Sequence, residues 1–294
     1  MLASDLVSAV AGIIFDGVAY GSLLFLISLG LSVTMGLMGF VNLAHGAFAM
    51  AGGFTCVELL RRSGISFLGT LPVVFVVTAV LGAGAEVLLY RRLYRRSHLD
   101  QVLFTIGLTF MASAAATWVW GPSQQPVTLP AWLHRQITIG GVEVSAYRLF
   151  LIAFVLLVSA VLGVLVTRTR FGAQLRAAVD NQTAAAGVGV NVGLLFTVTF
   201  AVGSGLAGLG GALSIDVLGL DPTFAIKYLV YFLLVVVVGG AGSFKGALIA
   251  SLSLGISDVA GKYYIPQIGG FVIYLAMVLV LIITPSGLHG RRAT

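Results

Sequence analysis

Residues 17–57 read GVAYGSLLFLISLGLSVTMGLMGFVNLAHGAFAMAGGFTCV, and none of these 41 residues is Asp, Glu, Lys or Arg. A helix of about 20 apolar residues crosses the hydrocarbon core of a bilayer, which is about 30 Å thick. As one helix the run would be about 60 Å long, at about 1.5 Å per residue. The chain therefore has to turn inside it. We expect the turn at residues 36–42, where two glycines and an asparagine weaken the helix.

Four more uncharged runs follow, at residues 149–167, 193–215, 228–244 and 263–288. Hydrophobic residues make up 59% of the 294 residues and charged residues only 9%, whereas about 25% of a soluble domain is charged. A water-soluble fold could not cover its surface with so few charges. The sequence therefore predicts an all-α, polytopic integral membrane protein, with residues 1–294 forming a single transmembrane domain.

The number of helices depends on how the glycine-broken segments are counted. Further helices are expected at residues 67–90 and 99–120, and a short hairpin at residues 136–144, where polar and apolar residues alternate. Glycines within residues 239–246 (GGAGSFKG) divide residues 228–257 into pieces of 17 and about 12 residues. The second piece is short for a span. The prediction is eight helices if short pieces are merged, and nine if each one crosses.

The basic residues indicate an orientation. Net charge is +6, and the arginines gather between the apolar runs, which is typical of loops that meet anionic lipid rather than of nucleic-acid binding. The positive-inside rule assigns these clusters to the cytoplasm. With nine crossings the amino terminus lies outside and the carboxyl terminus inside. The residues that carry this argument are Arg91, Arg92, Arg95, Arg96, Arg168, Arg170, Arg291 and Arg292.

Small residues mark the helix expected at residues 193–215 as central to the bundle. Gly203, Ala207 and Gly211 recur every four positions. This spacing puts them on one face, where a second helix backbone can approach closely.

Two glycine-interrupted segments resemble each other. Gly36-x-x-Gly39-x-x-Asn42 near one end of the chain matches Gly239-x-x-Gly242-x-x-Lys245 near the other, and such a pair indicates a midplane pathway in transporters built from repeats. Asn42 and His45 are expected on one helix face. There they either lock helices together by hydrogen bonds or line a translocation path. The predicted path residues are Asn42, His45, Gly46, Gly239, Gly240 and Gly242.

The polar segment 168–191 contains FGAQLRAAVDNQTAAAG at residues 171–187, which favours a short helix on the basic side. Arg176 and Asp180 are spaced to pair at i,i+4. The helix either lies passively at the membrane surface or forms a docking surface for a cytoplasmic partner. The predicted docking residues are Arg176, Ala177, Asp180, Asn181, Ala184, Ala185 and Gly187.

The candidates for ion coupling, metal binding and catalysis are weak. Asp16 and Glu86 lie in or near apolar helices, where an acid is a candidate for ion coupling, but both are near span ends and Glu86 can reach Arg91, which favours a structural role. The single cysteine, Cys56, and the scattered histidines give no metal site. Enzyme motifs fail as well: the match to GxGxxG at residues 203–208 lies inside a helix, and Phe244 stands where a phosphate-binding loop needs glycine.

Several segments together resemble the first permease, or H subunit, of the branched-chain amino acid ABC importers. They are residues 36–46 (GLMGFVNLAHG), 103–108 (LFTIGL), 169–191 (TRFGAQLRAAVDNQTAAAGVGVN) and 238–243 (VGGAGS). The resemblance covers nearly the whole chain. One departure is Ala47, where many relatives carry Glu, and this puts in doubt any role for that position.

The resemblance implies an assembly in the bacterial cytoplasmic (inner) membrane. This chain would form the path with a second, M-type permease. Two ATP-binding subunits would use ATP and Mg²⁺, so that this chain itself holds no cofactor, and its coupling loop would lie at about residues 168–191. A solute-binding protein would deliver the solute outside. Urea and short-amide permeases belong to the same type, so the solute stays open. The alternatives of other classes are an ion-coupled secondary carrier using Asp16 or Glu86, and an intramembrane enzyme using His45.

Overall fold

A computed structural model describes residues 2–94, 96–127, 129–139, 141–284 and 287–288. Arg95, Arg291 and Arg292, used above to assign the orientation, lie outside these residues, as does Pro285, near which the last helix is expected to end. Helices dominate the described residues: α1 (Leu2–Met38), α2 (His45–Ser63), α3 (Phe67–Leu88), η1 (Tyr90–Arg92), α4 (His98–Trp120), α5 (Ala146–Arg168), α6 (Arg170–Asp180), α7 (Gln182–Gly187), α8 (Val192–Leu218), α9 (Phe224–Lys227), α10 (Leu229–Gly239), α11 (Phe244–Tyr264) and α12 (Gly269–Ile283).

The all-α membrane fold is confirmed. Among the described residues, α1, α3, α4, α5, α8 and α11 are long and apolar enough to cross a bilayer, and the shorter helical segments Phe224–Gly239 and Gly269–Ile283 are also apolar. The expected hairpin forms from β1 (Gln136–Ile139) and β2 (Val142–Ser145), which pair antiparallel.

Two boundaries differ from the sequence prediction. The helix α1 continues to Met38, so the first break covers residues 39–44. The prediction that the piece after Gly246 is too short for a span is wrong, because α11 runs for 21 residues from Phe244 to Tyr264. The added turns contain Asp258 and Lys262, which form an ion pair at i,i+4. Opposite charges at this spacing stabilise a helix, so they do not end it.

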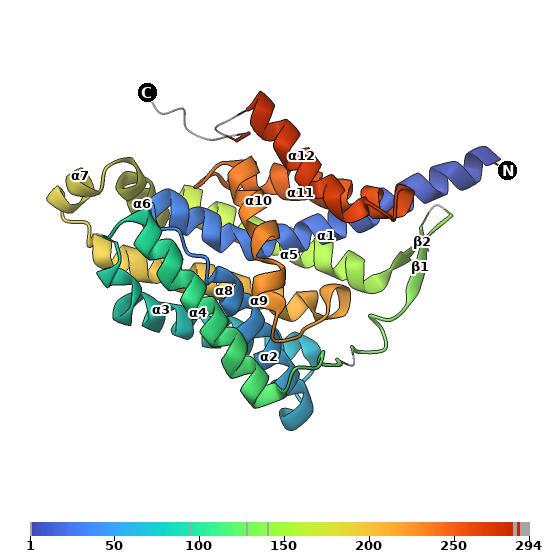
Figure 1. Ribbon diagram of the computed structural model, residues 1–294, viewed down its shortest axis with the longest axis horizontal. Coiled ribbons are helices and arrows are strands. Elements are labelled where there is room, and N and C mark those ends of the chain that lie inside the picture. Colours follow the sequence, from blue (N-terminus) through green and yellow to red (C-terminus); the bar gives the residue numbers. More distant parts are fainter. Residues whose placement is uncertain (1, 95, 128, 140, 285–286, 289–294) are drawn as a thin grey trace.

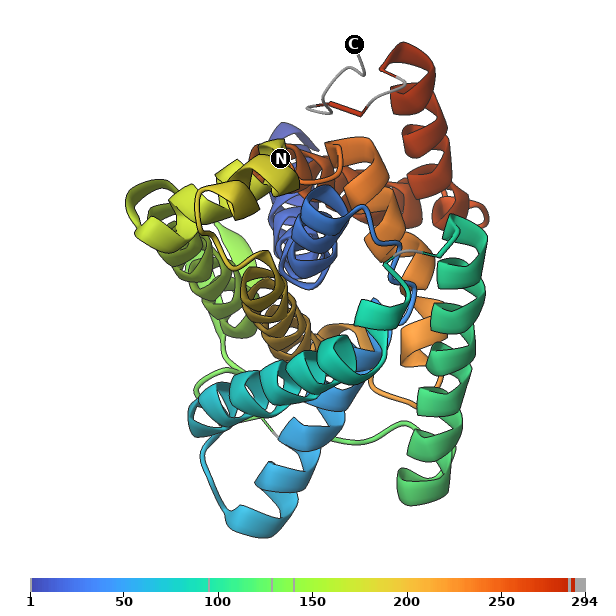
Figure 2. The ribbon, with the colours of Figure 1, turned by 90° about the vertical axis from the view of Figure 1, so that its left-hand side faces the viewer.

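The helix α8 lies in the centre of the bundle, as its small residues predict (Figure 2). It packs against α1, α2 and α3. A methyl group added to Gly203 would lie 3.0 Å from the Cα of Gly30 on α1, and one added to Gly211 would overlap the carbonyl oxygen of Ala49 on α2. Glycine is therefore required for these helix backbones to approach so closely.

The loops and helix ends gather at two opposite ends of the molecule (Figure 1). The first, the α6–α7 end, also contains the break between α10 and α11 and the start of α4. The second, the hairpin end, contains β1 and β2, the start of α1 and the last turns of α11. Backbone hydrogen bonds join loops to one another; one of them, of 2.8 Å, runs from the backbone N–H of Gln125 to the carbonyl oxygen of Leu220. The two ends are thus the candidate faces of the membrane protein.

Candidate functional site

The segment predicted as one short helix forms two, α6 and α7, joined at Asn181. The Asn181 side-chain oxygen accepts the backbone N–H of Ala184 at 2.9 Å, while the Asn181 N–H donates to the Ala177 carbonyl at 2.9 Å. Asparagine is a preferred N-cap. One residue therefore ends α6 and begins α7, which bends the segment at its middle.

A small apolar cluster fixes α6 and α7 to the start of α8. It consists of Leu175, Ala178, Ala185, Leu195 and Phe196, all of them buried. The other six predicted docking residues are exposed: Arg176, Ala177, Asp180, Asn181, Ala184 and Gly187. Ala185 differs from these six because it faces inward and anchors α7.

The helix α6 is also held tightly to the end of α5. A methyl group on Gly172 would overlap the Val166 carbonyl group, and the Arg176 guanidinium donates a hydrogen bond to that same carbonyl oxygen. The Thr169 hydroxyl between the two helices accepts the Gly172 N–H at 3.2 Å. The start of α6 is therefore packed directly against the backbone at the end of α5.

The break between α10 and α11 contacts the last turns of α1, which the sequence comparison alone did not predict. The Gly242 N–H donates to the Ser32 carbonyl oxygen at 2.9 Å, and a methyl group on Gly36 would overlap the Gly242 backbone. Gly240 and Gly242 have φ values of 89° and 81°, a region that favours glycine. Gly239 packs against the backbone of Gly246 across the turn. The end of α1 and the break between α10 and α11 thus form one joint at the α6–α7 end.

A cavity of about 430 Å³ connects this joint to α6. Gly36 lines it from α1, Gly242 from the break between α10 and α11, Val166 from α5, and Arg176 and Asp180 from α6. The predicted docking segment and the predicted path segment, more than 60 positions apart in the chain, therefore share one cavity wall.

Asn42 and His45 lie in the interior, but not on one helix face as expected. Asn42 is in the turn before α2, where its side-chain oxygen accepts the Ala44 N–H at 3.1 Å, and such a bond competes with helix formation. His45 begins α2, and its Nε2 lies 2.8 Å from the Ile27 carbonyl oxygen of α1. Gly46 packs on the Ala225 backbone of α9. All three residues contact the backbone near the first break or a neighbouring helix.

Polar side chains of α4 form hydrogen bonds with the backbone of the first break, residues 39–44. The Thr105 hydroxyl accepts the Leu43 N–H at 3.2 Å, and the Thr109 hydroxyl donates to the Leu43 carbonyl at 3.2 Å. Gln101 accepts the Val41 N–H at 3.4 Å. These bonds satisfy backbone groups that have no helical partner, as irregular backbone inside a membrane requires.

Asp16 and Glu86, the two candidate coupling acids, both form ion pairs. Asp16 pairs with Arg148 at the hairpin end. Glu86 is fully buried and accepts hydrogen bonds from Arg91 at 3.0 Å, Tyr94 at 3.0 Å and Thr197 at 2.7 Å. This network joins α3 to α8 and satisfies the carboxylate at both oxygens.

We expect the substitution Glu86→Gln to destabilise the chain by about 2 kcal/mol, because the buried network loses its charge and one acceptor. Unfolding of the purified chain in detergent measures the loss. Glu58→Gln is the matched control, since Glu58 is partly exposed and its ion-pair partner Arg62 is largely exposed. The glutamine oxygen can still accept the hydrogen bond that Trp120 Nε1 donates to Glu58, so the loss should stay below about 1 kcal/mol. Equal losses at the two sites would contradict the structural role of Glu86.

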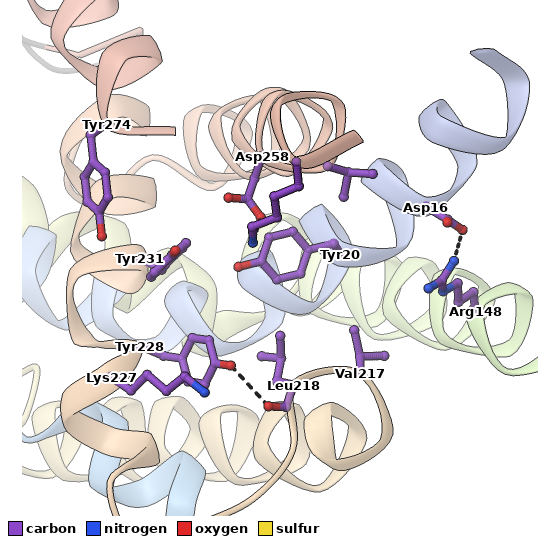
Figure 3. A pocket seen from close by; sticks show the side chains of 12 residues that line it. Asp16, Tyr20, Arg148, Val217, Leu218, Lys227, Tyr228, Tyr231, Asp258 and Tyr274 are labelled. Atoms are coloured by element: carbon purple, nitrogen blue, oxygen red, sulfur yellow. Dashed lines mark hydrogen bonds and ion pairs between the residues drawn. The ribbon is translucent and has the colours of Figure 1, made fainter. Parts of the chain in front are cut away.

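A second cavity, of about 450 Å³, opens near the hairpin end (Figure 3). Among its lining residues, only Asp16 was a candidate from the sequence. Asp258 and Lys262 were missed because the helical piece was expected to end at about residue 257. The available signal was the i,i+4 spacing of opposite charges in an apolar segment. The cavity is lined by Asp16, Tyr20, Arg148, Val217, Leu218, Lys227, Tyr228, Tyr231, Asp258, Val259, Lys262 and Tyr274.

Comparison with known proteins identifies the family. The family described as "Branched-chain amino acid transport system / permease component" matches residues 13–281. The permease protein BraD of a high-affinity branched-chain amino acid transport system from Pseudomonas aeruginosa is 26% identical over 289 residues, covering 94% of both chains. The corresponding protein LivH of Escherichia coli K12 is 25% identical over 296 residues, with 94% of both chains covered.

A probable branched-chain amino acid transport permease protein LivH from Methanocaldococcus jannaschii is 26% identical, over 95% of this chain and 92% of its own. No solved structure matches. Since the family match spans nearly all the described helices, this multi-pass membrane chain belongs to the family of permease components of branched-chain amino acid transport systems.

Proposed function

We propose that this chain is a transmembrane permease subunit of an ATP-binding-cassette importer for branched-chain or other hydrophobic amino acids, in the bacterial cytoplasmic membrane. The observation that carries the proposal is the cavity wall shared by α6 and the Gly242 break. It gives a route by which force on a docking helix reaches the interior of the bundle. The relatives named above act in branched-chain amino acid transport, which supports the substrate class.

In this proposal the α6–α7 end faces the cytoplasm and receives two ATP-binding subunits. They contact the exposed side of α6 and α7, and they supply the ATP and Mg²⁺ chemistry. Val166 carries both the Gly172 contact and the Arg176 hydrogen bond, so movement of α6 pulls on α5 and on the cavity beside Gly242. A second, M-type permease completes the path, and a solute-binding protein docks at the hairpin end.

The path residues fall into two groups by their contacts. Gly242 borders the inner cavity directly, and Gly239 and Gly240 shape its turn. Asn42, His45 and Gly46 are packed around the first break, which directly follows the end of α1, where Gly36 and Ser32 contact Gly242. We propose that these residues position the joint whose opening connects the path to the cytoplasm.

Reconstitution tests this function. The chain is placed in vesicles with the second permease and the ATP-binding subunits, and leucine-loaded binding protein is added outside. We expect leucine uptake only when ATP is enclosed, because the described acids near the span ends are already ion-paired. Uptake driven by an ion gradient, with neither ATP nor ATP-binding subunits, would identify a secondary carrier. Uptake of urea or acetamide in place of leucine would reassign the solute.

A further inference from the structure

We infer that the cavity at the hairpin end is a binding site for the free zwitterionic α-amino acid within the permease itself. This inference rests on the proposed function and names the chemistry of one solute-binding site on the translocation path. Its basis is a juxtaposition that the family match does not assign: a half-satisfied buried carboxylate and an additional cation in one cavity (Figure 3).

The cavity has a suitable depth for a solute arriving from outside. Tyr20 lines it from α1, and 18 residues separate Tyr20 from the end of that helix at Met38. At about 1.5 Å per residue this is about 27 Å, close to the thickness of a hydrocarbon core. The cavity and the α6–α7 end therefore lie near opposite surfaces of the membrane.

Asp258 supplies the acceptor for an ammonium group. Its side chain is 1% exposed, and its Oδ2 accepts from the Lys262 ammonium at 2.5 Å. Its Oδ1 is buried with no hydrogen-bond partner among the described residues. A buried charged oxygen without a partner is costly, and in native structures such a group calls for an explanation. Figure 3 shows the carboxylate directed into the space between Tyr20, Tyr231 and Tyr274.

Lys227 supplies the complementary cation. The cavity contains two acids, Asp16 and Asp258, which pair with Arg148 and Lys262. Lys227 takes part in none of the ion pairs formed by the described residues, and its ammonium lies 5.1 Å from the Tyr228 ring centroid. The lining thus has one cation more than it has acids. A solute carboxylate beside Lys227 would neutralise this excess.

The remaining wall suits an apolar side chain. Val217, Leu218 and Val259 line the cavity together with tyrosine rings. The Tyr228 hydroxyl donates to the Leu218 carbonyl at 3.1 Å, so its ring is fixed as a surface. An acceptor, a cation and an apolar wall match the three parts of a hydrophobic α-amino acid. Urea and short amides carry no charge and would leave both charged groups unused.

The i,i+4 spacing of Asp258 and Lys262 also allows a purely structural reading, in which the pair only stabilises α11. That reading does not account for the unpartnered Oδ1, nor for Lys227 on a different helix. The two readings predict different behaviour toward solutes that lack one charge, which makes them separable.

The test measures equilibrium binding to the purified complex without the binding protein, using L-leucine, N-acetyl-L-leucine and L-leucine amide. N-acetyl-L-leucine lacks the ammonium group and L-leucine amide lacks the carboxylate. We expect the wild type to prefer L-leucine over each analogue by about tenfold or more. N-acetyl-L-leucine leaves the buried Asp258 oxygen unpaired, and L-leucine amide cannot form the charge-assisted hydrogen bond to the exposed Lys227. Asp258→Asn should abolish the preference over N-acetyl-L-leucine, and Lys227→Gln the preference over L-leucine amide.

The vesicle assay described above separates this inference from the proposed function. ATP-dependent leucine uptake by the wild type supports the function, and both variants should lower its initial rate about tenfold while ATP hydrolysis stimulated by the binding protein persists. Asp221→Asn, outside the cavity at the same end, is the control and should keep the wild-type rate. Variants with wild-type uptake and wild-type preferences would overturn the cavity assignment alone. A wild type without ATP-driven uptake would count against the function.

Asp258→Asn leaves Lys262 without its ion pair and could impair folding. Lys227→Gln removes no ion pair among the described residues, so it reports on the cavity even if the first variant does not assemble. An unchanged preference over L-leucine amide in Lys227→Gln would overturn the role of the cation.

Discussion

Replacing Gly211 with alanine is expected to destabilise the bundle by about 3 kcal/mol or more, because the added methyl group has no space. It would overlap the carbonyl oxygen of Ala49, which belongs to the backbone of α2 and cannot rotate away. The helices α2 and α8 would have to separate, and α8 also carries the contacts to α1 and α3. Unfolding of the purified chain in detergent, together with its abundance in the membrane, measures the effect.

Gly163→Ala is the matched control for this experiment. Gly163 lies within α5, and a methyl group added there would meet nothing within 4 Å. Alanine has a higher helix propensity than glycine by about 1 kcal/mol, so this variant should be as stable as the wild type or slightly more stable. Similar stability of the two variants would show that α8 does not pack against α2 as described.

Replacing Ala184 with glutamate is expected to reduce co-purification of the ATP-binding subunits about tenfold or more while the permease itself stays folded. Ala184 is exposed on α7, next to the Asn181 side chain that caps this helix. A bulky charge in the centre of a docking surface excludes a close-fitting partner. The readout is the amount of ATP-binding subunit retained on the affinity-purified permease, normalised to permease content.

Two further variants make this result specific. Ala131→Glu places the same change at an exposed position in the loop before β1, and it should retain the ATP-binding subunits. Ala185→Glu forces a charge into the buried cluster with Leu175 and Phe196, so it should lower the stability of the permease as well. Normal co-purification with Ala184→Glu would argue against docking at α7.

The membrane class, most helix boundaries, the hairpin and the central position of α8 were predicted from the sequence. These features are local. A membrane helix satisfies its own backbone hydrogen bonds, so a long apolar run is sufficient to identify it. The spacing of Gly203, Ala207 and Gly211 also identifies a packing face without knowledge of its partner.

The candidate sites were predicted less completely. The predicted docking segment is helical, but its bend at Asn181, a local cap, was not predicted. The inward position of Ala185 was not predicted either, because it depends on contacts with α8. Asn42 was assigned to a helix face, whereas its side chain bonds to the Ala44 amide and lies in a turn. The i,i+4 spacing of Asp258 and Lys262 was visible, yet only folding shows that Lys227 lies at the same cavity.

The sequence by itself therefore determined the solvent of this protein, a lipid bilayer, and most of the segments long enough to cross it, because hydropathy and helical hydrogen bonding act over short stretches of chain. Only the tertiary structure decided that the end of α1 touches the Gly242 break, that α6 shares a cavity with them, and that Asp258 faces a cavity with an unpartnered oxygen. These contacts join residues up to about 200 positions apart. They depend on how closely whole helices pack, which no local pattern specifies.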